Sequence, residues 1–473
     1  MRRYGDFKLI LWPVATARGS YVSTLVDLLR NCTLEVPHGR LGNAKSRVVK
    51  LGMIFPDGRD PKQPGNVMAS LPVVSHELKS RVEDELVLLC ARTKVNAETS
   101  ARIAAITSRA EGIDWDYVYA IARRHSVLPL VYSQLNTPAA ANVPSDQLAR
   151  LKENYQKNAA RNLFLTAELC RILQTFEAAG IEALPYKGPA LAVYAYGNQA
   201  LRRFVDLDIM VRKADVIRAK DILMAGGFVC GTAWTNAQQA LLLRTQHNMS
   251  LSRDQGRLVV ELHWEVASSL FASSLQAEDL WGRLETMRLN NSAVKSLSAE
   301  DLLLSLCVHG SKHLWERLAW ICDVAELVKT RRDLDWEVLL KRAASTGNER
   351  MLLLGLYLTH SLLDAPLPAH IKSESEADGM IVSLAKEVTG RLFDGSETTP
   401  ATINQSIRFN WAVRSGWRSR LRYCRLLLQP TDADIEIMRL PRPLSFVYYL
   451  MRPFALLRRD RGRRLVPGNG RER

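Results

Sequence analysis

The chain has 473 residues, of which 47% are hydrophobic and 24% are charged, and its formal net charge at pH 7 is +15. This length predicts two or three domains with buried cores, and the composition excludes a largely disordered chain. The positive charge lies at the ends: residues 408–473 hold 16 arginines against five acidic residues, whereas residues 68–407 are close to neutral. The charge therefore says little about a site in the middle of the chain.

The apolar and cysteine patterns bear on the compartment. No uninterrupted apolar run reaches the roughly 20 residues of a membrane-spanning helix. Pro13 interrupts the short run Leu9–Ala17, which disfavours an export signal. The seven cysteines are scattered and form no CxxC pair. Such an odd, unpatterned set predicts reduced thiols and a cytoplasmic protein, and it disfavours a disulfide framework or a structural zinc site.

Residues 1–67 show little sustained periodicity and are rich in Gly, Pro and Arg. We expect either a basic, disordered leader or a mis-called start, with Met68 as the natural first residue. In residues 68–179, apolar residues recur at helical spacing, which predicts an N-terminal helical region. Its expected helices are Ser75–Arg92, Ala97–Ala110, Trp115–Arg124 and Ser145–Ala179.

Strand signals fall in residues 180–290, which predicts one compact module of mixed helices and strands. Gly226–Gly227 is expected to end a helix, and Asp254-Gln255-Gly256 is typical of a hairpin turn. The expected strands and helices are, in chain order, Ile181–Tyr186, Pro189–Tyr196 (helix), Phe204–Val211, Ala214–Ala225 (helix), Met249–Ser252 and Leu258–Trp264.

Helical periodicity returns in residues 291–400, so the predicted fold class is α+β, with a small mixed-sheet module embedded between N-terminal and C-terminal helical regions. The expected helices are Ala299–His313, Trp315–Thr330, Trp336–Ala344 and Glu349–Leu363. Residues 401–473 form a basic, Arg-rich tail. Three interpretations of its apolar segment Arg439–Arg464 stay open: packing on the body, an interfacial membrane anchor, or RNA binding.

Two aspartates stand out in the segment Phe204–Val211. If this segment is a strand, Asp206 and Asp208 point to the same face, because side chains alternate along a strand. Two carboxylates so close repel each other, and a divalent cation such as Mg²⁺ compensates that repulsion. The alternative is a half-exposed strand that carries two solvated acids.

A third carboxylate, Glu261, lies in the apolar segment Leu258–Trp264, where an unpaired charge is costly. Alternation places His263 on the same face as Glu261. The three acids Asp206, Asp208 and Glu261 are therefore the candidate metal ligands and catalytic residues.

Upstream, an expected strand ends in Lys187-Gly188, and a helix with Pro189 near its first position follows directly. A cation beside the free N–H groups of a helix N-terminus suits a triphosphate, although an ordinary strand-to-helix turn explains the pair too. Arg203, just before the aspartates, is a second candidate phosphate ligand or part of a solvated edge. Lys187, Gly188, Arg203 and His263 are thus the candidate nucleotide-binding residues.

His309, His313 and Arg317 are spaced so that all three can share one helix face. Zinc binding is disfavoured because no third ligand has a compelling register. Contact with phosphate or with an acceptor, and plain packing, both remain possible for the two histidines.

Taken in their order along the chain, these candidate motifs resemble those of the nucleotidyltransferase superfamily. The nearest resemblance is to the bacterial family described as uncharacterised nucleotidyltransferases, and a more distant one is to the abortive-infection toxin nucleotidyltransferases. The likeness covers roughly Glu83 to Leu363 and departs from the superfamily pattern in two places: Lys187-Gly188-Pro189 stands where Gly-Ser is usual, and the third acid is Glu. Its motifs are Lys187-Gly188, Arg203, Asp206-x-Asp208, Val260–Trp264, HSVLPLVY at 125–132 and WICD ending at Asp323.

The resemblance implies a polymerase-β-like fold, Mg²⁺ or Mn²⁺ held by Asp206, Asp208 and Glu261, and transfer of a nucleoside monophosphate from a nucleoside triphosphate (NTP). The acceptor is open: a small molecule, a glycan, a protein or RNA. Alternatives are a non-catalytic nucleotide-sensing or assembly protein and a toxin-like enzyme acting on tRNA. We expect a cytoplasmic enzyme, with peripheral contact of the tail at the inner face of the membrane left open. Asp208→Ala is expected to abolish transfer and to leave the fold intact.

Overall fold

The computed structural model describes residues 81–108, 112–231, 235–268, 271, 277–290, 292–394, 402–429 and 446–452. The expected leader at residues 1–67 and all of the expected tail segment except residues 446–452 lie outside the described residues. Residues 73–473 belong to one compact unit, within which all described residues fall. In the described part of the chain, no helix is long and apolar enough to cross a membrane.

The N-terminal region is helical, as predicted. Asn96 and Asp114 begin two of its helices by accepting hydrogen bonds from the backbone N–H groups of Thr99 and Tyr117. The longest helix, α6, has 34 residues, which corresponds to about 50 Å. The elements are α2 (Val82–Cys90), α3 (Ala97–Thr107), α4 (Trp115–Arg124), α5 (Leu128–Leu135), η3 (Pro138–Ala140) and α6 (Ser145–Ala178).

The central sheet is mixed and has the strand order β1-β2-β5-β4-β3. Its middle strands β2 and β5 are parallel, whereas β1, β3 and β4 each pair antiparallel with their neighbours. This arrangement confirms the predicted mixed-sheet module. The strands are β1 (Ala183–Pro185), β2 (Leu207–Val211), β3 (Val229–Cys230), β4 (Asn248–Arg253) and β5 (Leu258–His263).

Short helices and turns connect these strands. The predicted hairpin turn is confirmed, since Asp254, Gln255 and Gly256 all have positive φ between β4 and β5. The predicted glycine end of α8 is also confirmed: Gly227 has φ +86°, and its N–H donates to the carbonyl of Met224. The connecting elements are α7 (Gly188–Tyr196), η4 (Gln199–Leu201), η5 (Lys213–Asp215), α8 (Val216–Ala225), α9 (Asn236–Thr245) and η6 (Asp254–Gly256).

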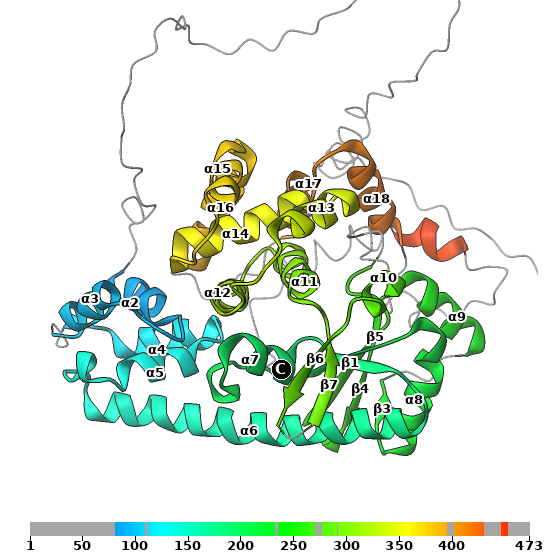
Figure 1. The fold of residues 1–473 in the computed structure, drawn as a ribbon, viewed down its shortest axis with the longest axis horizontal. Helices are drawn as coiled ribbons and strands as arrows, with labels where there is room; N and C mark the ends of the chain where they lie inside the picture. The colour runs from blue at the N-terminus through cyan, green and yellow to red at the C-terminus, as the bar shows by residue number, and fades with distance from the viewer. Residues whose placement is uncertain are drawn as a thin grey trace, which may run out of the picture. The chain divides into compact units, whose positions relative to one another are not determined.

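One hydrophobic core joins the sheet to α6 and α8. Figure 1 shows α6 running beneath both the first helices and the strands. Its apolar residues Leu165, Leu169 and Phe176 are fully buried and share a cluster with Ile209 of β2 and Leu262 of β5. The apolar side chains of β2 and β5 thus anchor the two strands, and the polar side chains that alternate with them point the other way.

The C-terminal region is helical again, after a two-stranded hairpin of β6 and β7 that the sequence did not reveal. The helix predicted at Glu349–Leu363 is confirmed at both ends. The elements are α10 (Ala277–Trp281), β6 (Glu285–Leu289), β7 (Ser292–Ser296), α11 (Ala299–Lys312), α12 (Leu318–Thr330), α13 (Trp336–Thr346), α14 (Glu349–Leu363), α15 (Ala369–Ala377), α16 (Gly379–Leu392), α17 (Ile403–Ala412) and α18 (Trp417–Leu428).

The helix expected to start at Trp315 begins instead at Leu318, because a non-helical turn separates α11 from α12. Leu314 and Trp315 have φ +57° and +53°, which no helix accommodates. The buried Trp315 ring packs where Gly310 of α11 and Gly355 of α14 carry no side chain. The expected common helix face of His309, His313 and Arg317 is therefore wrong, since α11 ends before the arginine.

Candidate functional site

Two carboxylates meet at the centre of the sheet. Asp208 on β2 and Glu261 on β5 are direct register partners in the parallel pair. Neighbouring strands lie about 4.8 Å apart, so both carboxylates project from one face at the same level. The strand predicted for Glu261 and its shared face with His263 are both confirmed, because His263 Nε2 lies 3.3 Å from Glu261 Oε2.

Lys187 neutralises one of these carboxylates. Its Nζ lies 3.1 Å from Asp208 Oδ1, and the two side chains are 14% and 7% exposed. Burial opposes the ionised form of Asp208, but Lys187 and His263 outweigh it and hold the pKa of this carboxyl well below its usual range. Burial also opposes the charge on Lys187, yet Asp208 keeps the pKa of the ammonium above its usual value. The two groups therefore form a buried ion pair.

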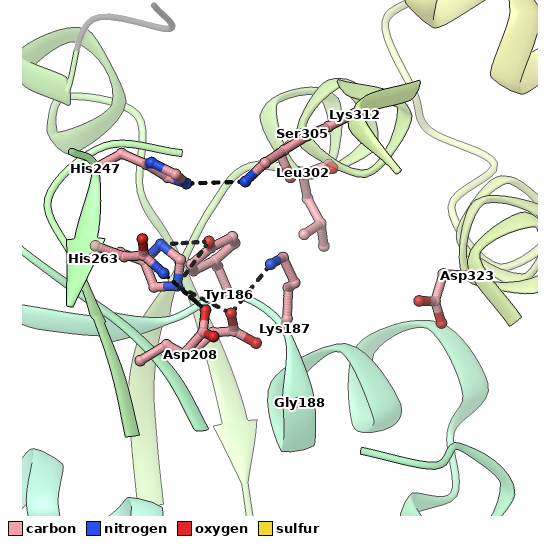
Figure 2. Close-up of polar contacts among 12 residues, drawn as sticks. Tyr186, Lys187, Gly188, Asp208, His247, His263, Leu302, Ser305, Lys312 and Asp323 are labelled. Carbon is pink, nitrogen blue, oxygen red and sulfur yellow. Dashed lines mark hydrogen bonds and ion pairs between the residues drawn. The ribbon is translucent and has the colours of Figure 1, made fainter. Parts of the chain in front are cut away.

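His263 bridges the acidic groups. Its Nε2 lies 3.1 Å from Asp208 Oδ1, and its Nδ1 lies 3.1 Å from the hydroxyl of Tyr186 (Figure 2). In the tautomer with the proton on Nε2, the ring donates to the carboxylates, and Nδ1 accepts from the hydroxyl of Tyr186. The hydrogen bond from His263 lowers the pKa of Glu261 despite its burial, and Asn248 donates a second hydrogen bond of 3.0 Å to Glu261 Oε2. The contacts of His263 therefore favour a role in orienting the two carboxylates over the predicted contact with a nucleotide.

Asp206 lies outside the strand in which it was expected. β2 begins at Leu207, so Asp206 sits in the bend that precedes the strand. The backbone of Gly188, which has φ +51°, approaches this bend closely: a Cβ on Gly188 would stand 3.3 Å from the Asp206 carbonyl oxygen. Burial and the charges of Asp208 and Glu261 raise the pKa of Asp206 to about 6. The charges of Asp208 and Glu261 therefore act on the Asp206 carboxylate, although Asp206 lies in the bend before β2 and the other two acids lie on strands.

The donor set fits a divalent cation. Ligand atoms of Asp208, Glu261 and His263 lie within 4.8 Å of one another, and no other group of this kind occurs among the residues that the structure describes. The carboxylates also influence one another, because the charges of Asp208 and Glu261 add to burial in raising the pKa of Asp206. Carboxylate oxygens are the ligands that Mg²⁺ prefers in proteins. The structure thus brings together two acids of the predicted trio, Asp208 and Glu261, with His263 as the third potential ligand, and Asp206 is not a member of this group.

Two further groups were not expected from the sequence. Figure 2 shows Lys312 of α11 reaching across to His247, with 3.3 Å between Lys312 Nζ and His247 Nε2. Burial lowers the pKa of His247 to about 2, so the ring is neutral and accepts the bond. Burial and the neighbouring Lys187 lower the pKa of Lys312 to about 8. A lysine between His309 and His313, in an otherwise buried helix, was the one sequence signal for this second cation.

His309 and His313 pack around a tryptophan. Their rings lie 4.7 Å apart, and each contacts the ring of Trp320 at 5.4 and 5.3 Å. Burial lowers the pKa of His313 to about 3 and that of His309 well below its usual value, so both rings are neutral. Of the alternatives left open, the contacts favour packing.

The arginine pair before the aspartates is divided in its contacts. Arg202 forms two hydrogen bonds with Asp323 of α12, from Nε at 2.7 Å and from Nη2 at 2.9 Å. The hydroxyl of Tyr196 donates a third, of 2.7 Å, to Asp323 Oδ1. Arg203, the predicted phosphate ligand, is exposed and lines a cavity with Arg202, Arg317 and Trp320. Lys187, Asp208 and Glu261 are not part of the lining of this cavity, so Arg203 stands apart from them.

Comparison with known proteins places this geometry in a family. No curated protein and no solved structure matches the chain at a significant level. Residues 111–364 match the family described as uncharacterised nucleotidyltransferase. The matched stretch contains Lys187, the three acids, Lys312 and Asp323, and it covers more than half of the chain. On this match the chain belongs to the uncharacterised nucleotidyltransferase family, as its motifs predicted.

Proposed function

We propose that the protein transfers a nucleoside monophosphate from an NTP to an acceptor hydroxyl, with Mg²⁺ or Mn²⁺ held by Asp206, Asp208 and Glu261. The observation that carries this proposal is the register pair Asp208–Glu261, with Lys187 ion-paired to it, in a chain of the nucleotidyltransferase family. The oxygen donors and the local excess of negative charge support a hard divalent cation. His263 orients Asp208 and Glu261 through its Nε2 hydrogen bonds.

The triphosphate would lie between two lysines. Lys187 precedes α7, whose N-terminus carries a partial positive charge, and Lys312 faces the same cluster from α11. Lys187-Gly188-Pro189 offers no serine hydroxyl where Gly-Ser is usual, so the cationic groups would bind the phosphates. Lys312 releases its contact with His247 to bind an anion, because a neutral imidazole is a weaker partner than a phosphate.

In the transfer step, the acceptor oxygen forms a bond to the α-phosphorus while the bond between the α-phosphorus and the pyrophosphate oxygen breaks. The acceptor proton passes to a carboxylate, for which Glu261 is the candidate, and pyrophosphate leaves with the electron pair. A divalent cation, if held by Asp206, Asp208 and Glu261, would supply neutralisation of the charge on the leaving group. Asp208, Lys187 and His263 hold their positions throughout, because each is buried and hydrogen-bonded.

A second candidate function is nucleotide sensing without catalysis. One observation favours it: Asp208 is already satisfied by Lys187 and His263, so the carboxylate pair is stable without an ion. A sensor would bind Mg²⁺ and NTP and release no pyrophosphate. A toxin that acts on tRNA is a narrower enzymatic alternative, which growth arrest on induction would favour. For either function we propose a cytoplasmic site of action, which the free thiols of the described cysteines support.

The test is transfer of label from α-³²P-NTPs into cell extract in the presence of Mg²⁺, followed by identification of the labelled product. The matched variant is Asp206→Asn, which removes one proposed ligand and leaves the Lys187–Asp208 ion pair in place. Asp254→Asn, in the exposed turn η6, is the control. We expect labelling by the wild type and the control and at least a hundredfold loss in Asp206→Asn. Equal labelling by Asp206→Asn, or NTP binding without pyrophosphate release, overturns the proposal.

A further inference from the structure

A cavity opens where the chain before β2 meets the start of α12. Arg202, Arg203, Arg317, Trp320 and Asp323 line it. Arg317 and Trp320 stand together, with the guanidinium carbon 5.8 Å from the centre of the indole ring. We call Arg203, Arg317 and Trp320 the arginine pocket.

The charges of the arginine pocket are not balanced from within. Asp323 is the single carboxylate of its lining, and Arg202 and Tyr196 already occupy both of its oxygens. Among the residues that the structure describes, Arg203 and Arg317 have no carboxylate within ion-pair distance, and both are exposed. Partial burial and the charges of Arg317, Arg161 and Arg123 lower the pKa of Arg203. Arg203 and Arg317 thus face one cavity without a counter-charge of their own, which favours an anionic ligand.

The arginine pocket adjoins the proposed reaction site. Arg203 precedes Asp206 by three residues, a span of at most about 10 Å of chain. Arg202 Nη1 also donates a hydrogen bond of 3.4 Å to the carbonyl of Gly188, so the pocket wall contacts the proposed triphosphate site. Because Lys187 and Lys312 already face the acidic cluster, Arg203 and Arg317 are available to a second anion next to the nucleotide.

We infer that the arginine pocket binds backbone phosphates of the acceptor, and that the acceptor is a single-stranded polynucleotide whose terminal hydroxyl reaches Asp206. This inference rests on the proposed transfer reaction. More arginines converge here than one phosphate group needs. Arg161 of α6 donates a hydrogen bond of 3.2 Å to the Val205 carbonyl, which places a further positive charge beside the chain that precedes β2. Trp320 lines the same cavity and carries the Arg317 guanidinium over its ring, and a guanidinium plane is a surface on which an unstacked base can stack.

The test is fluorescence anisotropy of a labelled single-stranded RNA with the full chain, without NTP or Mg²⁺, over a range of salt concentrations. The variant is Arg203→Gln/Arg317→Gln. The control, Arg288→Gln/Arg332→Gln, removes the same charge from exposed positions on β6 and beyond the far end of α12. This control corrects for non-specific binding by the basic ends of the chain.

We expect the variant to bind RNA at least tenfold more weakly than the control, with a salt slope lower by about 1.4 for two lost phosphate contacts. Arg203→Lys/Arg317→Lys should recover most of the affinity. Mg²⁺–NTP binding, measured by calorimetry, should be the same in Arg203→Gln/Arg317→Gln as in the control Arg288→Gln/Arg332→Gln.

Equal RNA binding by variant and control overturns the inference. Weakened NTP binding in the variant also overturns it, because that result would assign the arginines to the triphosphate. Binding of inorganic phosphate to the arginine pocket without any binding of RNA overturns it too. Failure of the proposed function is distinguishable, because it would leave RNA binding dependent on Arg203 and Arg317 with no label transferred to the strand.

Discussion

Asp208 and Glu261 are paired in register on parallel strands, and Lys187 neutralises only the first of them. The sheet fixes the separation of the two carboxylates, because each strand is anchored by buried apolar neighbours on its other face. Glu261 keeps a hydrogen bond to Asn248 on the opposite side. The pair is therefore rigid in position and unequal in charge balance, and this inequality gives rise to the following predictions.

Replacement of Asp208 by alanine should cost stability as well as activity. The sequence suggested an intact fold, but the structure shows that Lys187 would be left buried without its counter-charge. We expect a loss of about 3–5 kcal/mol in the free energy of unfolding, measured by urea denaturation. Lys187→Met/Asp208→Leu should lose less than Asp208→Ala, because it removes both charges. Equal stability of wild type and Asp208→Ala would contradict the buried ion pair.

Binding of Mg²⁺ should weaken as the pH falls below about 6, where the raised pKa of Asp206 places its protonation. A raised pKa in the folded state stabilises the metal-free fold below the unfolded value of 3.8, and this contribution is lost as the pH rises through about 6. Mg²⁺ should then offset the charge. Calorimetry should show an affinity falling by up to about tenfold per pH unit below 6. Asp206→Asn should abolish this slope, and its persistence would assign the titration elsewhere.

Lys312→Gln should raise KM for the NTP. The lysine is the second cation facing the acidic cluster, and a charged hydrogen bond to a phosphate contributes about 1.5–3 kcal/mol, or roughly 10- to 100-fold in kcat/KM. Lys341→Gln on the exposed side of α13 is the control and should behave as wild type. Above pH 8 the wild type should lose the same contribution, because the pKa of Lys312 is about 8. Identical kinetics of the two variants would exclude Lys312 from nucleotide binding.

Arg202 and Asp323 should show strong coupling in a double-mutant cycle. Asp323→Leu leaves the Arg202 guanidinium buried without its partner, so we expect a loss of about 3–5 kcal/mol in the free energy of unfolding. Arg202→Met/Asp323→Leu should be less destabilised than the sum of the single variants. Thermal and urea denaturation of the four proteins measure this. Simple additivity would mean that the ion pair contributes little to docking of α12.

Gly310→Ala should destabilise the fold by about 1–3 kcal/mol or more, because its Cβ would stand 2.5 Å from atoms of the buried Trp315 ring. Gly390→Ala is the matched control, since it lies inside α16 with no atom within 4 Å of its Cβ. There the substitution should stabilise by about 0.5–1 kcal/mol through helix propensity. Differential scanning calorimetry of both variants should show melting temperatures that move in opposite directions.

Features written into local sequence were predictable. The helix Glu349–Leu363 and the hairpin around Asp254 follow from apolar spacing and from residues that tolerate positive φ. Asp208 and Glu261 followed from strand alternation, since a carboxylate between apolar neighbours is costly unless it has a function.

Features created by tertiary contact were not predictable. Asp206 lies in the bend before β2, where the Gly188 backbone approaches its carbonyl oxygen, and alternation carries no information about that contact. His247 and Lys312 become partners through the docking of α11 on the sheet. The break at Trp315 depends on two glycines from different helices. Each of these contacts joins positions whose pairing only the folded chain defines.

The contact between Arg202 and Asp323 has a consequence for how this protein can be divided. A fragment that stops after β7 would retain the three acids and Lys187 but lose Asp323 and Lys312, so Arg202 would be orphaned and the loop before β2 unsupported. We therefore expect that the sheet module cannot be transferred to another protein without α11 and α12. Truncations, domain swaps and split-protein designs must keep α11 and α12 on the same polypeptide, or supply them in trans.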